Sequence, residues 1–541
     1  KLYISFCTGR AYQGAQSNGK ALINHANRFD KLLNLTVSYK RTIAEKHTLD
    51  GLLGYEWQRL TRDGYSMEAS DFSSEAINNA DDIGTGKARP SIGSYRSSTD
   101  VASYFGRINY NYADRYLLTF TLRADGSDKF GSNNQWGYFP SGAFAWRIEQ
   151  EDFMKNLDFI SNAKLRLSVG QTGNSDFSGN AFAYYRTGRD YLFGNQQNTG
   201  IYLDQNGNPS LKWETTTEYN LGLDLGFLKN RINFGLELYT KRISGLLGSS
   251  NKPYYFPVNY VAANIGKTSS RGFEINLNTV NFQGEFTWTS NLNLSRYVDK
   301  WVKRNPDVVL NVHQSTKDPL RPIWGYQLGG ILQPGDEVPA HMPGAKPGAQ
   351  IIQDIGSVDD NGNRVWIPDG KIGNEDLIML GTSDPDLIFG FTNSFEYKGF
   401  DLNIHVYGSL GWKRHNDYLG SMMDLYSKID DGRNYPAYDQ GKFWSSENPN
   451  GKYPNLFVSG TTAPGRSQFA IESADFLKVR NITLGYTFNN IKGVDKYFKN
   501  LRVYVDGGNP FTWTKFSKID PEYTGTYPSA TTYTFGLNVK F

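Results

Sequence analysis

Residues 531–541, TTYTFGLNVKF, end the chain on a strict two-residue alternation. Tyr533, Phe535 and Leu537 fall on one side of this stretch, and hydrophilic residues such as Asn538 fall on the other. Because successive side chains of a β-strand point to opposite faces, the alternation predicts a strand with one apolar and one hydrophilic face. The same alternation recurs at 104–112, 273–278, 402–406 and 501–506.

The alternating segments are long for soluble strands. Many run to roughly 10–14 residues, which suits a tilted strand that crosses a membrane better than the usual strand of a soluble sheet. The pattern predicts about sixteen strands, at 2–12, 29–43, 47–62, 95–111, 116–128, 137–149, 163–174, 211–227, 230–243, 270–281, 284–297, 386–398, 400–411, 473–489, 501–514 and 531–541.

The predicted connections alternate between short and long. The short ones include Ala44–Lys46, Ala113–Arg115, Leu228–Lys229, Phe282–Gln283 and Lys398–Gly399. The long ones are 63–94, 175–210, 244–269, 298–385 and 412–472, and two turns on the short side, 150–162 and 490–500, are longer than the rest. This asymmetry is typical of an up-and-down barrel with short periplasmic turns and long extracellular loops, and it predicts a periplasmic C-terminus.

Composition agrees with this class. The chain has 541 residues with 35 Tyr, 33 Phe and 56 Gly, which favours strands and turns. Its mean hydropathy of -0.54 is low, as expected where only alternate residues of a strand face lipid. A net charge of +3 gives no argument for nucleic acid as a partner. With Cys7 as its single cysteine the chain cannot form an internal disulfide.

Closure is the physical reason for a barrel. Hydrocarbon cannot satisfy backbone N–H and C=O groups, so a sheet in the membrane has no open edge. The chain starts at Lys1 with no initiator Met and no signal peptide, so we expect it to be the interior of a longer precursor. Sixteen strands could close alone, but this start suggests that earlier strands complete a wider ring.

Many short motifs, in order, identify a family resemblance. The chain resembles the SusC/RagA family of TonB-dependent outer-membrane transporters from about residue 95 onward. The motifs are SYFGRINY (103–110), RYLL (115–118), RADGS (123–127), WGYFPS (136–141), KLR (164–166), GQTGN (170–174), LKWE (211–214), SADFLKVRNITLGY (473–486), DPE (520–522) and the terminal Phe541.

The resemblance implies a 22-stranded barrel in the outer membrane of a Gram-negative bacterium. It also implies an N-terminal plug, energy from the TonB complex, and a SusD-like surface lipoprotein that acts as a lid. Residues 1–541 would then be the C-terminal part of the barrel, with the plug, the TonB-contacting segment and the first six strands absent from this chain. The resemblance leaves open whether the transporter–lid pair forms a homodimer.

Catalytic and metal motifs are weak. Gly266-Lys267-Thr268 is no phosphate loop, because the required earlier glycine is Val261. The six histidines lack ligand spacing, so we expect no catalytic residues and no metal centre. The acidic turn at 369–376 resembles half of an EF-hand, but Val365 and Ile367 stand where oxygen ligands belong. Loop calcium stays open against an ordinary acidic turn.

Two sets of side chains are the candidate site. Long-loop aromatic residues beside carboxylates suit sugars, peptides or a protein lid, with packing or a membrane girdle as the alternative. These loop candidates are Trp324, Tyr326, Trp366, Asp369, Trp412, Tyr418, Tyr435 and Trp444. The alternation places a second set in the lumen, where we expect charged residues to bond each other or a plug: Arg107, Arg123, Asp125, Arg502 and Asp506.

The leading functional hypothesis is active import of oligosaccharides, by a barrel that makes and breaks no covalent bonds. Oligopeptide cargo for the same machinery is the first alternative. A passive porin and a glycan-binding adhesin are alternatives of other classes. An adhesin should be extracted without detergent, whereas apolar rows facing membrane lipid require detergent.

Overall fold

The computed structural model describes most of the chain. The described residues are 2–7, 17–73, 82–179, 181–188, 190–252, 256, 258, 260–305, 308–416, 441–455, 470–489, 500–517, 520–523 and 529–540. In this part no helix is long and apolar enough to cross a membrane. The helical elements described are the short 3-10 turns η1 (Ile83–Thr85), η2 (Ile148–Gln150), η3 (Asp152–Met154) and η4 (Asn374–Asp376).

One antiparallel sheet of sixteen strands dominates the described residues, and each strand pairs with the next one along the chain. Each predicted strand range overlaps one of these strands, so the predicted all-β, up-and-down architecture is confirmed. The strands are β1 (Leu2–Cys7), β2 (Lys20–Ile43), β3 (His47–Ser70), β4 (Ser91–Tyr112), β5 (Tyr116–Ser127), β6 (Trp136–Arg147), β7 (Ile160–Asn174), β12 (Glu214–Phe227), β13 (Ile232–Ser244), β16 (Lys267–Phe282), β17 (Phe286–Lys303), β24 (Leu387–Tyr397), β25 (Phe400–Leu410), β28 (Phe476–Asn489), β29 (Asn500–Thr514) and β30 (Thr532–Lys540).

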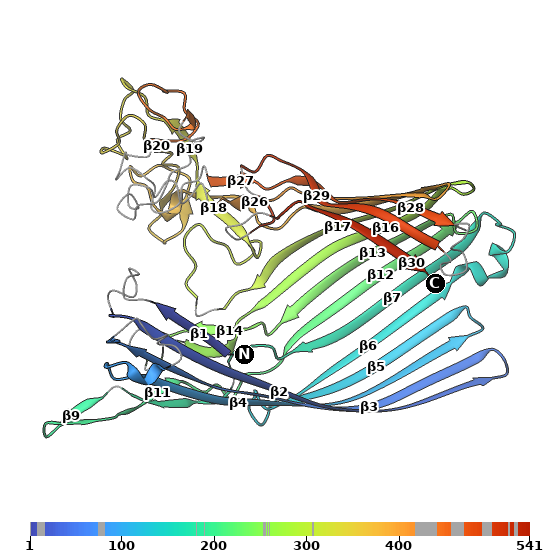
Figure 1. Ribbon diagram of the computed structural model, residues 1–541, viewed down its shortest axis with the longest axis horizontal. Coiled ribbons are helices and arrows are strands. Elements are labelled where there is room, and N and C mark those ends of the chain that lie inside the picture. Colours follow the sequence, from blue (N-terminus) through green and yellow to red (C-terminus); the bar gives the residue numbers. More distant parts are fainter. Residues whose placement is uncertain are drawn as a thin grey trace.

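The sheet curves, and its connections are asymmetric (Figure 1). The long connections gather at one end of the strands, and the short turns and the C-terminus lie at the other end. We call these ends the long-loop rim and the short-turn rim. β1 and β30 are the edge strands of the described sheet. A total of 22 strands stays a prediction.

The apolar rows lie on an uncovered face of the sheet. Phe535 is 79% exposed and belongs to the apolar row predicted at 531–541, and Phe120 and Leu238, at 54% and 43%, belong to the apolar rows of β5 and β13. No second large sheet covers them in the described residues. The rows therefore suit contact with lipid rather than the interior of a sandwich. We call this side the apolar face and the opposite side the polar face.

Short turns reverse the strands at the short-turn rim. Lys398 and Gly399 join β24 to β25 with φ angles of 48° and 91°. Two consecutive positive φ angles define the turn whose twist matches the twist of the flanking strands. Ala44 and Glu45, at 48° and 57°, also have positive φ angles, in the three-residue turn that joins β2 to β3 without glycine.

The first hairpins are longer than predicted. β2 starts at Lys20 rather than residue 29, and β3 runs to Ser70 rather than residue 62. The prediction that 63–94 forms one loop was therefore wrong at both of its ends. Antiparallel pairing continues past the apolar rows because backbone hydrogen bonds need no apolar side chains, and polar pairs such as Lys20–Glu68 flank the extension.

The long loops contain small hairpins of their own. They are β8 (Tyr184–Thr187) with β11 (Ile201–Gln205), β9 (Tyr191–Phe193) with β10 (Gln196–Asn198), β14 (Leu247–Asn251) with β15 (Tyr260–Asn264), β18 (Pro322–Tyr326) with β23 (Leu377–Thr382), β19 (Leu328–Ile331) with β20 (Gln350–Ile352), β21 (Ser357–Val358) with β22 (Arg364–Val365), and β26 (Lys413–His415) with β27 (Ile471–Ser473).

Among the described residues, two buried apolar clusters lie in the long connections. Phe130, Leu211 and Ala262 come from three different connections and pack with Trp213 at the long-loop rim. Leu332, Ala345 and Ala349 form a second cluster inside the loop that follows β17. Such clusters hold long loops in fixed shapes.

Candidate functional site

The hairpin of β18 and β23 carries two of the predicted loop residues. Trp324 lies opposite Met379, and Tyr326 lies opposite Leu377. Tyr326 is buried, and that burial raises the pKa of its phenol. The hairpin belongs to the loop segment above the long-loop rim (Figure 1).

A cavity of about 540 Å³ opens beside this hairpin. Trp324 lines it and meets His313 edge to face, with ring centroids 4.8 Å apart. Burial lowers the pKa of the His313 imidazole, so the ring is neutral at pH 7. Within the described residues, Trp324 Nε1 and His313 Nδ1 have no hydrogen-bond partner. The indole N–H of Trp324 can donate to a ligand's hydroxyl or carbonyl oxygen, and the free imidazole nitrogen of His313 can form a second hydrogen bond, at low desolvation cost. The remaining polar lining is Asn311, Gln314 and Asn374.

Trp366 is exposed and carries a cation on its ring. Its side chain is 64% exposed, and the guanidinium carbon of Arg364 lies 3.8 Å from the ring centroid. A stacked guanidinium holds the ring in place and covers one of its faces. Trp366 lies outside the lining of the cavity at Trp324.

The acidic segment that includes Asp369 folds through carboxylate–amide hydrogen bonds. Asp376 is fully buried, and it accepts the N–H groups of Ile355 at 2.8 Å, Gly356 at 3.0 Å and Gly373 at 2.8 Å. Asp369 Oδ1 accepts the N–H of Lys371 at 3.0 Å. These contacts make the segment a set of turns built around carboxylates.

The carboxylates of this segment are engaged with backbone amides rather than converging on a shared point. Asp354 accepts the N–H groups of Asp369 at 3.2 Å and Gly370 at 2.6 Å. In the part of the chain that the structure describes, no group of three or more His, Cys, Asp or Glu residues could hold a metal ion. Whether a loop binds calcium stays a prediction for experiment.

Two other predicted tryptophans anchor loops. Trp444 is buried and donates from Nε1 to Gln333 Oε1 at 2.9 Å, and its ring packs against the backbone of Gly348. The backbone N–H of Trp412 approaches Asp475 Oδ1 at 3.3 Å, beside the start of β28. Contact of either ring with cargo or a lid stays a prediction. Tyr418 and Tyr435 lie outside the described residues.

The polar face carries the predicted lumen residues on β4 and β5. Arg123 donates to Asp125 at 2.7 Å and to Ser103 at 2.9 Å, and its guanidinium also pairs with Glu56 at 3.3 Å. Arg107 donates to a neighbouring threonine hydroxyl at 3.3 Å. The charge of Arg123 is therefore compensated by two carboxylates, whereas Arg107 makes a hydrogen bond to a neutral hydroxyl; both arrangements suit the water-facing side of a barrel wall.

A second compensated pair lies near the other edge of the sheet. Arg502 makes a bidentate pair with Asp401, at 2.8 Å from Nε and 2.5 Å from Nη2. Asp506 accepts from Asn481 at 2.5 Å and from Thr483 at 2.6 Å. Asp401 reaches Arg502 from β25 across the intervening strand β28.

Sequence reasoning missed a ring of four asparagines on the polar face of β16 and β17. Asn276 donates to Asn293 at 2.5 Å, Asn293 to Asn291 at 2.6 Å, and Asn278 to Asn276 at 2.5 Å. Asn291 closes the ring by donating to Asn278. Each carboxamide has two N–H donors and an oxygen with two lone pairs. The ring uses one donor and one lone pair of each, so half of this capacity remains for water or cargo.

Next to this asparagine ring lies a charged cluster that was also missed. Arg166 pairs with Asp224 at 2.7 Å and with Glu237 at 2.6 Å. These residues, Glu274 and two members of the ring line a shallow hollow of about 410 Å³. The alternation of β16 signalled polar residues at 274, 276 and 278, but pairing with the next strand was needed to place them together.

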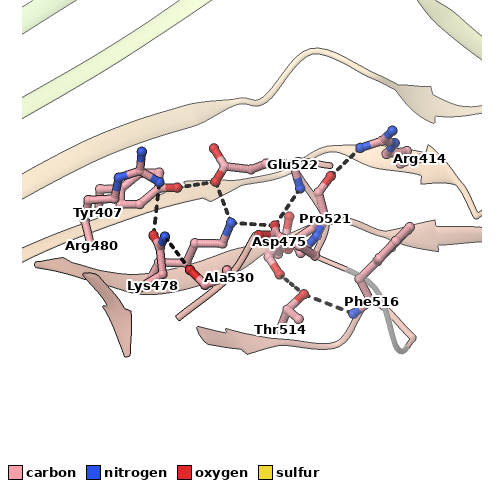
Figure 2. Close-up of polar contacts among 12 residues, drawn as sticks. Tyr407, Arg414, Asp475, Lys478, Arg480, Thr514, Phe516, Pro521, Glu522 and Ala530 are labelled. Atoms are coloured by element: carbon pink, nitrogen blue, oxygen red, sulfur yellow. Dashed lines mark hydrogen bonds and ion pairs between the residues drawn. The ribbon is translucent and has the colours of Figure 1, made fainter. Parts of the chain in front are cut away.

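Two motifs of the resemblance meet at the long-loop rim (Figure 2). Lys478 on β28 is buried and contacts Asp520 at 2.5 Å and Glu522 at 2.6 Å. Tyr407 on β25 donates its hydroxyl to the same Glu522 carboxylate. Arg414 donates to the carbonyl of Pro521 at 2.7 Å. The segment after β29 is therefore tied to two preceding strands and to the hairpin of β26 and β27.

Comparisons with known proteins agree on one family. The model of the family described as "TonB dependent receptor-like, beta-barrel" matches residues 4–342. TonB-dependent receptor P3 of Formosa agariphila is 30% identical, over 98% of this chain and 54% of that protein. TonB-dependent receptor SusC of Bacteroides thetaiotaomicron is 30% identical, over 95% of this chain and 50% of that protein. The chain spans about half the length of these curated relatives.

Solved structures share the fold. The RagAB peptide transporter structure aligns with a TM-score of 0.79 at 21% identity, over 97% of this chain and 56% of that chain. The RagAB peptide importer in its closed-closed state aligns with a TM-score of 0.80 at 22% identity, over 99% and 58%. The resemblance to SusC and RagA is thereby confirmed. This chain belongs to the TonB-dependent receptor-like β-barrel family of the Gram-negative outer membrane.

Proposed function

We propose that this chain is the barrel part of a transporter that imports oligosaccharides in a TonB-dependent manner. Family membership supports the transport function. The remainder of the protein would supply the plug and the segment that contacts TonB. A SusD-like surface lipoprotein would dock at the long-loop rim as a lid, as the pairing of RagA with a second component in RagAB suggests. A homodimer of the pair stays a prediction.

The observation that favours oligosaccharide cargo over peptide cargo is the asparagine ring on the polar face. Its unused donors and acceptors match the hydroxyl groups of a glycan, each of which both donates and accepts. A neutral carboxamide surface also binds neutral cargo without leaving an uncompensated charge. The cavity at Trp324 and His313 adds an aromatic face and two unpartnered polar atoms at the entrance.

Oligopeptide cargo is the second candidate. The RagAB structures are described as those of a peptide importer, and this chain shares their fold. The carboxylates of Glu237 and Glu274 in the hollow would suit lysine or arginine side chains of a peptide.

Uptake by cells that carry the native protein tests both candidates. Fluorescently labelled oligosaccharides and labelled peptide mixtures are supplied to the native strain, to a strain lacking this protein and to a strain lacking TonB. We expect glycan uptake only in the native strain. Uptake of peptides alone would overturn the sugar assignment. Uptake that continues without TonB would overturn active import and indicate a passive pore.

A further inference from the structure

A cluster of four cations lies on the apolar face near the long-loop rim. Arg242 on β13 and Lys300 on β17 both lie opposite Ser269 of the intervening strand β16. Arg271 lies two residues further along β16, and Arg296 lies opposite Phe273. Because alternate residues of a strand share a face, all four side chains belong to the side that carries Leu238 and Ile275. All four are exposed. We call this cluster the basic patch.

The basic patch has too few acids of its own. Arg296 has a distant partner in Asp386, at 3.8 Å. The side chains of Arg242, Arg271 and Lys300 make no hydrogen bond or ion pair with another residue of the described chain, although their backbones belong to the ladder. The residues opposite these three in the ladder are uncharged: Thr217, Thr240, Ser269 and Val298. On a face built for lipid, such cations need an anion from outside the chain.

An apolar groove of about 1010 Å³ runs along the same face and ends at Arg271. Gly142 leaves part of the groove floor without a side chain. Hydrocarbon chains fit a groove of this kind, and its charged end fixes where a headgroup would lie. Its walls include Phe120, Phe144, Leu167, Val169, Leu221 and Leu238.

The height of the basic patch matches a headgroup rather than the membrane centre. Arg271 is the fifth residue of β16, counted from the long-loop rim. At a rise of about 3.4 Å per residue and a tilt of about 40°, it lies roughly 10 Å below the end of the strand. An arginine facing lipid costs about 2–4 kcal/mol at the midplane but only about 0–1 kcal/mol near the interface.

The spacing of the cations suits more than one phosphate. Neighbouring strands lie about 4.8 Å apart, so Arg242 and Lys300, two strands apart, flank a gap of roughly 10 Å. Arginine binds phosphate oxygens through two parallel N–H groups. With Arg271 between and below them, the patch can bind two phosphates on one headgroup while acyl chains lie in the groove.

From these observations we propose that the basic patch and the groove form a binding site for a bisphosphorylated glycolipid of lipid A type in the outer leaflet. The proposal rests on the long-loop rim facing outward, as the proposed function requires. It does not depend on the cargo, so failure of the sugar assignment leaves it intact.

Native mass spectrometry of the purified native protein tests the site. The probes are purified lipid A, lipid A from which the phosphates have been removed, and phosphatidylglycerol. We expect lipid A to remain bound to the native protein, and the double variant Arg242→Gln/Arg271→Gln to lose at least about tenfold in affinity. Dephosphorylated lipid A should bind the native protein as weakly as lipid A binds the double variant.

A matched control lies on the same face at the opposite rim. Arg41 on β2 lies opposite Leu49, three residues before the turn at Ala44, and is exposed. Arg41→Gln removes the same charge and should leave lipid A binding unchanged. Retention of a folded barrel is checked by the shift of the unheated band on gel electrophoresis. Equal binding of lipid A by the native protein and by the double variant overturns the proposal. Equal binding of lipid A and of phosphatidylglycerol by the native protein also overturns it, as does a protein bound to the basic patch in place of lipid.

Discussion

Lys478 Nζ lies 2.5 Å from Asp520 Oδ1, with the lysine side chain 3% exposed and the aspartate side chain 11% exposed. The two residues are 42 positions apart and belong to two separate motifs of the family resemblance. Glu522 completes the contact, because its carboxylate also reaches Lys478. The pair ties the segment after β29 to the sheet and so fixes part of the long-loop rim.

Replacing Lys478 by methionine should release the segment at Asp520. Removal of one partner leaves a buried carboxylate unpaired, at a cost of about 3 kcal/mol, which is roughly a hundredfold in the opening equilibrium. Amide hydrogen exchange of residues 520–523 should rise by that factor. Lys398→Met is the control, because Lys398 is 62% exposed and its contact with Glu285 is 3.9 Å long. Unchanged exchange in the Lys478 variant would show that the pair does not hold the loop.

The Lys478–Asp520 pair also predicts that the segment after β29 loses its attachment to the sheet at low pH. Burial alone would raise the pKa of Asp520, but hydrogen bonds, above all the one from Lys478, outweigh it and leave the pKa below its ordinary value. A lowered folded pKa stabilises the folded loop fully above the unfolded pKa of about 3.9. That stabilisation is lost as the pH falls through the folded pKa. Exchange or proteolysis at 520–523 should therefore increase below about pH 4 in the native protein.

The variant Asp520→Asn distinguishes the titration of Asp520 from the titration of other carboxyl groups. The variant lacks the titrating carboxyl group, so its loop should be loosened already at pH 7 and should change less between pH 7 and pH 3. An acid transition of the same size in native protein and variant would assign the effect to other carboxylates.

The strands were predictable because their two faces meet different solvents. The alternation of Tyr533, Phe535 and Leu537 reflects lipid on one side and water on the other, so position along the strand fixes the face of each side chain. Beyond the apolar rows this signal ends. The sequence therefore could not show that β2 begins at Lys20 or that β3 continues to Ser70.

The side-chain clusters were not predictable, because they depend on register. Asn276 lies opposite Asn293 only because the ladder of β16 and β17 shifts register between Val280 and Phe282. A ladder one residue out of step would bring different side chains together. Lys478 and Asp520 were both visible in motifs, but a loop that folds back on the sheet makes their contact. A loop that folds back on the sheet leaves no periodic pattern of side chains in the sequence.

Asp376→Ala should unfold the acidic turn of the loop after β17. The fully buried carboxylate accepts three backbone N–H groups, from Ile355, Gly356 and Gly373. Each donor left unsatisfied costs about 1–3 kcal/mol. Amide exchange at these three positions should rise by at least about tenfold. Asp336→Ala is the control, because that carboxylate accepts one N–H, from Gln333, and is exposed.

Chelation addresses calcium in the same loop. The carboxylates of Asp354 and Asp376 are engaged with backbone amides, so EDTA should leave exchange at Gly356 and Gly373 unchanged. Faster exchange in EDTA that added calcium reverses would establish a loop ion and contradict this expectation.

Trp324→Ala tests the cavity at the entrance. The substitution removes the ring that meets His313 edge to face and opens one wall of the 540 Å³ cavity. If the cavity binds cargo, affinity for a labelled oligosaccharide should fall by about tenfold, equivalent to about 1.4 kcal/mol. Trp324→Phe keeps an aromatic face but removes the unpartnered Nε1 donor, so it should lose less. Trp366→Ala is the matched control, because that ring is exposed and lies outside the cavity lining. Binding is measured on the native transporter–lid complex. Unchanged affinity in Trp324→Ala would show that this cavity does not bind the cargo. A larger loss of affinity in Trp366→Ala than in Trp324→Ala would indicate that the cargo contacts the exposed tryptophan instead.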